Sequence, residues 1–271
     1  MKNNYEINKI YRDDFGRVSG IFAVDKPEGK RSHDVVYDYR RKLETREVGH
    51  AGTLDPFASG LLIILVGKAT KLFEKFLMLD KEYIADVAFG FKTDTLDPEG
   101  EISEALDNVE DINISDGELK EVLNSFKPEY EQYVPIFSSV KVQGNKLREL
   151  ARNHDRYTFI DKEQEKYIQF WQGNEVKKEI PLPSKLVKIY EVELLELNKK
   201  SLKDYDKPFN EKLISQLNNR NIDSFFVAKI RVRCSKGTYI RKLAEDIGAK
   251  FQLPAMLIGL RRTKIGDIII G

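Results

Sequence analysis

The most constraining feature of this chain is the string GHAGTLDPFASG, Gly49 to Gly60, which runs directly into the apolar segment LLIILV. Glycines at both ends of the string and at position 52 permit backbone conformations that a Cβ atom would forbid. Pro56 stiffens the chain next to the single carboxylate, Asp55. The apolar segment predicts a buried strand. We therefore expect a rigid loop at the lip of a buried strand, with one acid at its centre.

An acid in such a place is a typical nucleophile or general base. A plain turn is the alternative, because Asp-Pro is a common turn pair. The triplet LDP alone does not decide between the two, but the whole twelve-residue string is far more specific and favours the functional interpretation.

The composition indicates a globular chain without a membrane span. The 271 residues are 41% hydrophobic and 33% charged, which suffices for one large domain or two modest ones with a sizeable core. No run of 18 apolar residues occurs. The polar start, MKNNYEINKIYRDDFG, lacks the apolar region of a secretory signal. We therefore expect a cytoplasmic protein that does not contact membranes.

Neither a metal nor a cofactor is expected. The single cysteine, Cys234, rules out an intramolecular disulfide and a cysteine zinc site. The three histidines, at positions 33, 50 and 154, do not have the spacing of metal ligands. There is also no Walker loop, and no G-x-G-x-x-G string opens a helix.

Charge is distributed unevenly, although the net charge is only +1. From Lys229 to the end there are ten Lys or Arg and three Asp or Glu, whereas Glu101 to Tyr130 holds two basic and nine acidic residues. Such segments can form a polyanion-binding face and an opposite pole. They could equally pair with each other in the fold, and composition leaves both possibilities open.

The hydrophobic patterns predict strands and helices in irregular alternation, without the even rhythm of a parallel barrel or doubly wound sheet. Strands are expected at 20–29 (ending in a turn), 61–66, 81–91, 185–197 (with a possible break near Tyr190), 224–235 and 255–263. Helices are expected at 34–43 after an N-cap at Ser32, at 68–78, at 119–126 after a Ser115/Glu118 capping box, at 210–219 and at 238–251. We predict an α+β fold with a large, mixed, mainly antiparallel sheet flanked by helices and loops.

Two further residues could act beside Asp55: Tyr83 in a predicted strand and Arg241 at the start of a predicted helix. An ionised aspartate can act on a sugar carbon, and an adjacent arginine would orient it. A tyrosine offers a flat face for a base and a phenol for proton transfer. A half-buried sheet tyrosine and a surface ion pair are the structural alternatives. By themselves these residues predict a carboxylate enzyme or a polyanion-binding domain.

Seven blocks, in the same order, resemble the TruB family of tRNA pseudouridine synthases between about Gly20 and Thr263. The blocks are DKPEGKRSHDVV, GHAGTLDPFASGLLIILVGKATK, DKEYIADVAFGFKTDTLDPEG, FSSVKVQGNKLRELAR, KIYEVELLEL, RCSKGTYIRKLAEDIG and LRRT. The resemblance implies a pseudouridine synthase fold and the isomerisation of uridine-55, in the T loop of tRNA, to pseudouridine without a cofactor or a metal.

The resemblance also assigns roles to particular residues. It implies that Asp55 is the catalytic aspartate, that Arg241 pairs with it, and that Tyr83 stacks on the target uracil and is a candidate to move a proton. Tyr239 is expected to line the pocket. His50 is expected to enter the T loop and help hold the flipped-out nucleotide, although a plain loop histidine is the alternative.

Several basic residues are candidates for contacts with the RNA. Lys26 lies in the family's DKP-x-G motif and is expected to be structural or to face the RNA. Backbone phosphates could be bound by Lys141, Lys146, Arg148, Arg152, Arg261, Arg262 and Lys264. Surface solvation is the alternative for any one of them.

The chain departs from the family pattern at its end. It stops at Gly271, eight residues after Thr263, whereas bacterial members continue into a small RNA-binding domain. We expect 1–19 to be an N-terminal extension and 20–271 to be the catalytic domain, with no C-terminal PUA-like domain. Contact with the acceptor arm of tRNA should then be reduced.

Two polar segments, at about 155–180 and 198–223, look like insertions into the family pattern. They could supply RNA contacts or be solvated surface excursions, and their mixed charges favour the second interpretation.

Two other functions are compatible with parts of this pattern. A guide-RNA-dependent synthase of the dyskerin type shares the catalytic loop but relies on a C-terminal RNA-binding domain. A non-catalytic tRNA-binding or folding factor would not need Asp55, Tyr83 and Arg241. A monomeric, stand-alone enzyme acting on tRNA is therefore the favoured prediction. The sequence does not choose between attack of Asp55 on C1′ and a glycal route.

Overall fold

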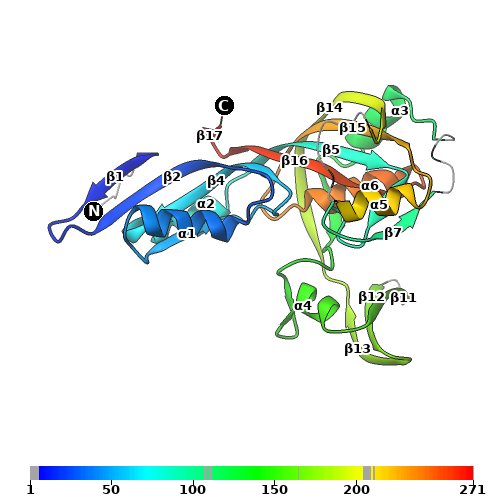
Figure 1. Ribbon diagram of the computed structural model, residues 1–271, viewed down its shortest axis with the longest axis horizontal. Helices are drawn as coiled ribbons and strands as arrows, with labels where there is room; N and C mark the ends of the chain where they lie inside the picture. The colour runs from blue at the N-terminus through cyan, green and yellow to red at the C-terminus, as the bar shows by residue number, and fades with distance from the viewer. Residues whose placement is uncertain are drawn as a thin grey trace.

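The computed structural model describes residues 6–106, 109, 112–163, 165–203, 209 and 211–270. A ten-stranded sheet runs along the molecule in the order β1-β2-β4-β16-β5-β15-β14-β8, with β3 paired to β4 and β17 paired to β16 (Figure 1). Its strands are β1 (Lys9–Arg12), β2 (Val18–Lys26), β3 (Val48–Ala51), β4 (Ser59–Val66), β5 (Lys81–Phe89), β8 (Glu129–Tyr133), β14 (Ser184–Ser201), β15 (Ser224–Cys234), β16 (Ala255–Ile265) and β17 (Ile268–Ile269).

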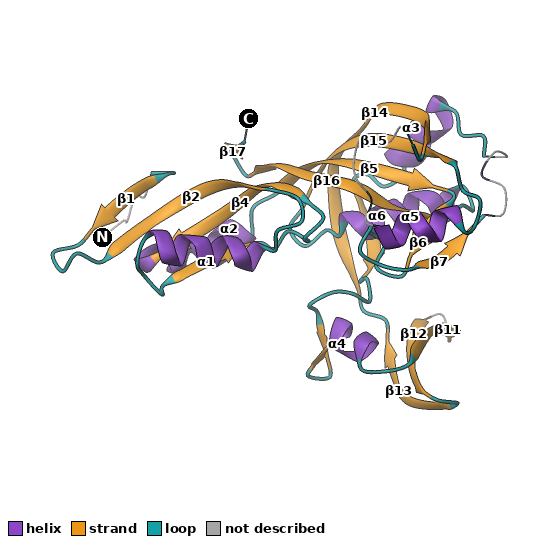
Figure 2. Cartoon of the chain, in the orientation of Figure 1, coloured by secondary structure: helices purple, strands orange, loops and turns teal. Residues whose placement is uncertain are grey.

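Helices cover this sheet and short strand pairs flank it (Figure 2). The helices are α1 (Ser32–Lys42), the 3-10 helix η1 (Gly67–Leu72), α2 (Phe73–Leu77), α3 (Asp116–Asn124), α4 (Leu147–Arg152), α5 (Glu211–Asn218) and α6 (Ile240–Lys250). The other strands are β6 (Phe91–Thr93), β7 (Ile102–Ala105), β9 (Lys141–Val142), β10 (Asn145–Lys146), β11 (Arg156–Lys162), β12 (Glu165–Gln172) and β13 (Glu175–Pro181). Within the described part of the chain, no helix is long and apolar enough to cross a membrane.

The strand β4 is buried on both faces, which explains its uninterrupted apolar sequence. Leu62 and Ile64 pack with Val35 and Val36 of α1 on one face. Its alternate residues, Leu61, Ile63 and Leu65, pack with residues from η1 and α2 on the other face. Burial on both faces fixes the register of β4, because a shift by one residue would exchange the two packed faces.

A narrow parallel contact joins the two halves of the sheet. β4 and β16 pair in parallel through only Ser59–Arg261 and Gly60–Arg262, whereas every other ladder between named strands in the described ranges is antiparallel. β4 begins at this seam, and the loop that carries Asp55 leads directly into it. The loop that carries Asp55 therefore lies where the two halves meet.

A smaller unit hangs from the main sheet (Figure 1). It consists of α4 and the antiparallel sheet β11-β12-β13, and its own core includes Leu147, Ile168, Phe170 and Ile180. Residues 155–180, expected as a solvated surface excursion, thus form an ordered sheet. The apolar residues of this segment are few, but they alternate on one face and pack against α4.

The predicted fold class is confirmed, and most predicted elements are present. The strand predicted at 185–197 is the long β14, and its register shifts between Ile189 and Glu191, at the predicted break. The capping box of Ser115 and Glu118 is formed. The predicted N-cap at Ser32 is wrong, because the cap position is Arg31 and the Ser32 hydroxyl bonds instead to the backbone of Leu54.

The glycines of the opening string differ in how strictly they are needed. Gly49 lies in β3, where an added Cβ would meet nothing within 4 Å. Gly60 has a φ of +103°, and a Cβ there would lie 2.8 Å from Arg262 N. Among the glycines of this string, only Gly60 therefore combines a left-handed backbone with a neighbouring strand too close for a side chain.

We predict that Gly60→Ala lowers the free energy of unfolding by roughly 3 kcal/mol, since it adds backbone strain and forces β4 away from β16. Gly49→Ala is the matched control and should change it by less than about 0.5 kcal/mol. Urea unfolding followed by circular dichroism measures both. Equal stability of the two variants would contradict the importance of the seam.

Candidate active site

Asp55 lies on the short loop between β3 and β4, and the loop is tied down on either side of it. The Ser32 hydroxyl donates to Leu54 O and accepts from Leu54 N, both at 2.9 Å. The Lys26 ammonium donates to Pro56 O at 3.2 Å. The carboxylate between these two anchored residues is 37% exposed. Asp55 is thus a fixed acid that solvent or a substrate can reach.

Arg262 ties both ends of the same loop to β16. Its Nε donates to Leu61 O at 2.7 Å and its Nη2 to Gly52 O at 3.0 Å. We expected Arg262 to face RNA phosphates. The structure places it elsewhere, because its side chain is 1% exposed and its donors are directed at main-chain carbonyls.

Arg241, in the first turn of α6, brings two carboxylates together. Its Nε lies 3.0 Å from Asp55 Oδ2, and its Nη1 lies 3.2 Å from Asp97 Oδ2. Two carbonyl oxygens accept its remaining hydrogen bonds, Thr95 O at 2.7 Å and Phe137 O at 3.2 Å. The guanidinium is almost fully buried, so these four acceptors leave it one orientation. The expected pair of Arg241 with Asp55 is present.

Asp97 is a member of this site that the sequence analysis treated only as part of a turn. The triplet Leu96-Asp97-Pro98 repeats Leu54-Asp55-Pro56, and both triplets present their acid to Arg241. This repetition is the signal that could have found it. Asp97 Oδ1 accepts hydrogen bonds from Thr95 Oγ1 at 2.6 Å and Glu99 N at 3.0 Å.

The two acids of the site lie in different environments. Asp97 is buried, and burial raises the pKa of its carboxyl although Arg241 opposes this. Asp55, by contrast, is partly exposed. The pKa of the nearby Glu99 is also raised, by burial and then by the charges of Asp97 and Asp55. The site therefore concentrates negative charge around one arginine, with Asp55 as its accessible acid.

Tyr83 lies on β5, opposite Arg262 on β16 and Val232 on β15. It is 8% exposed, and burial raises the pKa of its phenol, to which the charge of Asp55 adds. The phenol therefore stays protonated at neutral pH and is suited to donate a hydrogen bond.

Tyr239 and His50 lie close in the chain to the two central residues of the site, Tyr239 to Arg241 and His50 to the loop that carries Asp55. Tyr239 is the N-cap residue of α6, two residues before Arg241, and burial raises the pKa of its phenol. His50 lies on β3, and burial lowers the pKa of its imidazole, so the ring is neutral at pH 7. Its Nδ1 is buried and makes no hydrogen bond to the residues that the structure describes.

Two more of the predicted RNA-facing residues, Lys26 and Arg261, make contacts within the protein. Lys26 is fully buried and donates to Pro27 O and Lys30 O as well as Pro56 O, and burial lowers its pKa to about 8. The structural interpretation of Lys26 therefore fits, and its ammonium is not available to a phosphate. Arg261 is partly exposed and pairs with Asp25 through two bonds of 3.0 and 2.7 Å.

Arg148 belongs to the smaller unit, and Lys141 lies on the strand pair β9-β10 that leads into α4. Lys141 is exposed on β9, and Arg148 lies half-buried on α4.

The basic segment that starts at Lys229 is largely neutralised within the fold. On β14, Glu196, Glu193 and Glu191 pair with Lys229, Arg231 and Arg233 of β15, at 3.8, 2.7 and 3.1 Å. The sequence left open a polyanion-binding face or pairing with residues 101–130. Instead, β14 supplies the partners of the three basic residues on β15, because cross-strand register places the charges opposite each other.

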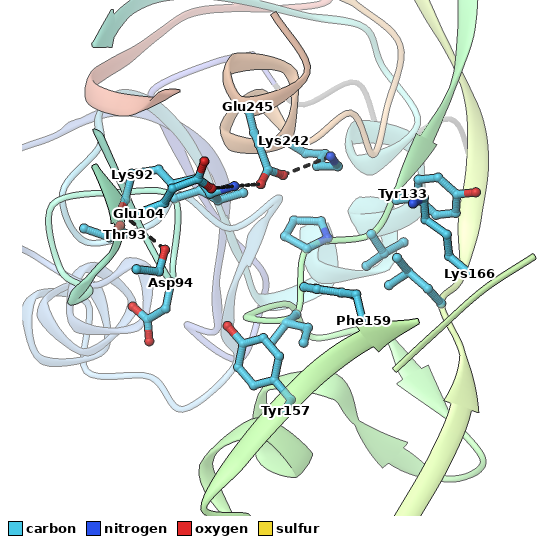
Figure 3. A pocket seen from close by; sticks show the side chains of 16 residues that line it. Lys92, Thr93, Asp94, Glu104, Tyr133, Tyr157, Phe159, Lys166, Lys242 and Glu245 are labelled. Carbon is cyan, nitrogen blue, oxygen red and sulfur yellow. Dashed lines mark hydrogen bonds and ion pairs between the residues drawn. The ribbon is translucent and has the colours of Figure 1, made fainter. Parts of the chain in front are cut away.

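A cavity of about 420 Å³ lies next to the segments that hold Arg241. Leu96 and Ile136 line it, and their neighbours Thr95 and Phe137 bond to Arg241. Figure 3 shows Lys92, Glu245 and Lys242 joined along one wall and Tyr157 and Phe159 on another. Asp55 does not line this cavity, so we do not propose it as the place where the substrate reacts.

The geometry supports acid–base or nucleophilic chemistry by one fixed carboxylate. Within the described ranges, no group of three or more His, Cys, Asp or Glu side chains is placed to hold a metal ion. The resources of the site are Asp55, the guanidinium that orients it and the protonated phenol of Tyr83.

Comparison with known proteins identifies relatives that cover most of the chain. A family model described as TruB family pseudouridylate synthase (N terminal domain) matches residues 40–169. The tRNA pseudouridine synthase B of Caldicellulosiruptor saccharolyticus is 40% identical over 249 residues, which are 92% of this chain and 68% of that protein. The protein of the same name from Caldanaerobacter subterraneus is 36% identical over 257 residues, 93% of this chain and 71% of that protein.

Solved structures share the fold at low sequence identity. A chain of an H/ACA RNP bound to a substrate RNA containing 2′-deoxyuridine has a TM-score of 0.55 at 21% identity, over 93% of this chain and 49% of that chain. A chain of a Cbf5-Nop10-Gar1 complex has the same score and identity, over 98% of this chain and 57% of that chain. At this identity the likeness establishes the fold alone.

We predict that Arg262→Lys lowers the free energy of unfolding by about 2 kcal/mol, because an ammonium cannot reach Leu61 O and Gly52 O together as the planar guanidinium does. Arg261→Lys is the control and should cost less than about 0.5 kcal/mol, as expected of a partly exposed ion pair. Chemical denaturation measures both. If only nucleic-acid affinity changed in the Arg262 variant, the buried, structural role would be wrong.

Proposed function

This chain belongs to the TruB family of pseudouridine synthases, and we propose that it converts uridine-55 in the T loop of tRNA to pseudouridine as a stand-alone enzyme. The enzyme is an isomerase. Relatives that are 36–40% identical over more than nine-tenths of the chain are tRNA pseudouridine synthases B, which supports tRNA as the substrate.

The reaction is balanced without any co-reactant. The N1–C1′ bond of the uridine breaks, the uracil turns, and a C5–C1′ bond forms. C5 then loses its hydrogen as a proton, and N1 takes up a proton. No electron leaves or enters, so the protein has to supply only positioning, charge stabilisation and proton transfer.

Asp55 is the residue to which we assign the central step. Its carboxylate would either attack C1′ or assist loss of the C2′ proton on a glycal route. Its support is the geometry of the loop: the residues on both sides of Asp55 are anchored, and Arg241 fixes one carboxylate oxygen at 3.0 Å. The other oxygen, Oδ1, is left to act on the sugar. This fixed, accessible acid on a buried arginine is the observation that carries the proposal.

The target nucleotide has to leave the loop of the RNA before it can reach Asp55. Extrusion of a base costs a few kcal/mol. Stacking on Tyr83, at about 1–3 kcal/mol per base, would offset much of this cost. The neutral ring of His50 would fill the space that the base leaves, and Tyr239 would line the pocket beside Arg241.

Two other functions remain as outcomes of a test. A guide-RNA-dependent synthase would be inactive on tRNA alone. A non-catalytic tRNA-folding factor would bind tRNA without turnover. The intact set of Asp55, Arg241 and Tyr83 favours the enzyme.

We predict that the wild-type protein releases tritium from tRNA transcripts labelled with [5-³H]-uridine, and that release stops when the T-loop uridine is replaced by cytidine. Asp55→Asn should abolish turnover while changing tRNA affinity by no more than about threefold, because it removes the reacting carboxylate but keeps the shape of the site. Filter binding on the same transcripts measures affinity. Turnover by the Asp55→Asn variant at the wild-type rate would contradict the assignment of the central step to Asp55.

We also predict that Asp97→Asn lowers the single-turnover rate about tenfold or more, with tRNA affinity nearly unchanged. The reason is that Arg241 loses one of the two carboxylates that fix it, so that Asp55 is less well oriented. Asp94→Asn, in the same turn, is the control and should stay within about twofold of wild type. An Asp97 variant with an unchanged rate would show that Asp55 alone is sufficient to place Arg241.

A further inference from the structure

The turn 235–239 leads into α6 and ends at Tyr239, two residues before Arg241. Tyr239 is the N-cap of α6, and Arg241 lies in the first turn of the helix. The side chain of Tyr239 makes no capping hydrogen bond. The helix start is therefore held by other means, and whatever holds it also sets the position of both residues.

Gln132 on β8 binds the backbone of the N-cap residue. Its side-chain Oε1 accepts from Tyr239 N at 2.8 Å, and its Nε2 donates to Tyr239 O at 3.1 Å. Gln132 is 0% exposed, so its amide meets both backbone groups of one residue in a site without solvent. Its Nε2 also donates to the hydroxyl of Tyr130, which donates to Asp246 on α6 at 3.4 Å.

Lys185 on β14 holds the same turn from the other side. Its ammonium donates to Gly237 O and lies 4.0 Å from the centre of the Tyr239 ring. Gly237 has a φ of +77°, so its carbonyl is directed by a left-handed backbone. A cation over the face of a tyrosine is attracted by the ring and restricts its orientation.

The two side chains work from neighbouring positions. Lys185 and Gln132 are direct partners in the antiparallel pair of β14 with β8. β14 makes a further contact with the turn, since Lys188 O accepts from Ser235 N at 2.9 Å and Lys188 N donates to Ser235 Oγ at 3.0 Å. Residues of β8 and β14, at one edge of the main sheet, therefore bind the turn at Ser235, Gly237 and Tyr239.

We propose that Gln132 and Lys185 are positioning residues that hold the turn 235–239 and so set Tyr239 and Arg241 for the reaction. The assignment rests on the proposed function for the nature of that reaction. Neither residue has to touch the substrate. Gln132 fixes the backbone at the helix start, and Lys185 fixes the ring of Tyr239.

We call Gln132 and Lys185 together the clamp. Because Lys185 titrates, its contribution to the clamp should depend on pH. Burial lowers the pKa of its ammonium to about 8. The charged form is thus present at pH 7 and is lost as the pH rises through 8, and the attraction to the Tyr239 ring is lost with it. Facing it are Tyr239, whose own pKa is raised and which stays neutral in this range, and the amide of Gln132, which does not titrate. Neighbouring charged residues are Glu131 on β8, Lys188 on β14 and Lys236 in the turn.

The test compares Lys185→Met, Lys185→Arg and the control Lys188→Met in single-turnover tritium release between pH 6.5 and 9.5. Lys185→Met should lower the rate at saturation about tenfold at pH 7, with KM within about threefold. Lys185→Arg keeps the charge at every pH, so its rate should stay within about threefold of wild type at pH 7 and should not show the decline above pH 8 that we expect of wild type. Lys188 contributes only backbone bonds to the turn, so Lys188→Met should follow the wild-type profile.

A second readout does not depend on activity. With 4-fluorophenylalanine in place of Tyr239, the ¹⁹F resonance should shift between pH 7 and 9 in the otherwise wild-type protein and stay constant in the Lys185→Arg background. An inactive wild-type protein with this pH-dependent shift would refute the proposed function and leave the clamp supported. An active wild-type protein with an unchanged rate and pH profile in Lys185→Met would overturn the clamp.

Gln132→Glu adds a check on the second arm. It keeps an acceptor for Tyr239 N but loses the donor to Tyr239 O, and it places a charge where the amide was buried. A fall in rate at saturation of at least about tenfold, with unfolding still cooperative, supports the clamp. A folded variant with the wild-type rate would remove Gln132 from it.

Discussion

The close contact of β4 with β16 at Gly60 and Arg262 is the constraint on which the rest of the site depends. The two halves of the sheet meet there through only two parallel pairs, and the absence of a side chain at Gly60 allows the strands to approach. The buried guanidinium of Arg262 then donates hydrogen bonds to Gly52 O and Leu61 O, on either side of Asp55. Because the same residue closes the sheet and binds the loop, the position of Asp55 is set by the fold and not by the loop alone.

The second organising element is one buried cation shared by two acids. Arg241 contacts Asp55 and Asp97, which come from loops about forty residues apart in the chain. A buried guanidinium without partners would be strongly unfavourable, whereas one with two carboxylates and two carbonyls is satisfied. The two acids differ in burial. Asp97 is enclosed and helps to hold Arg241, whereas Asp55 is accessible to a substrate. The edge formed by β8 and β14 completes the arrangement by holding the start of the helix that carries Arg241.

Much of the fold could be predicted because its signals are local. The run LLIILV predicts β4, the alternation in SFFVAKIRVRC predicts β15, and the Ser115/Glu118 pair predicts the start of α3. The segment 155–180 was harder, because its few apolar residues are separated by charges. It becomes a sheet only when Ile168, Phe170 and Ile180 find α4 as a partner surface. The neutralisation of the basic residues on β15 likewise depends on their register with β14. Amino-acid composition carries no information about this register.

The sequence by itself singled out Asp55 and Arg241, which the structure brings together, and it predicted Tyr83 as a third residue of the site, because the blocks that carry them are long and specific. Only the tertiary structure decided which charges face inward. Arg262 was expected to bind RNA phosphates and Lys26 to be either structural or RNA-facing, and both are buried donors to main-chain carbonyls. Asp97 carried only the weak signal of a repeated Leu-Asp-Pro triplet, and Gln132 and Lys185 carried none, since each acts through a residue that is distant in the chain. The physical reason is that side-chain burial and hydrogen-bond partnership arise from long-range packing, whereas sequence patterns report on neighbours along the chain.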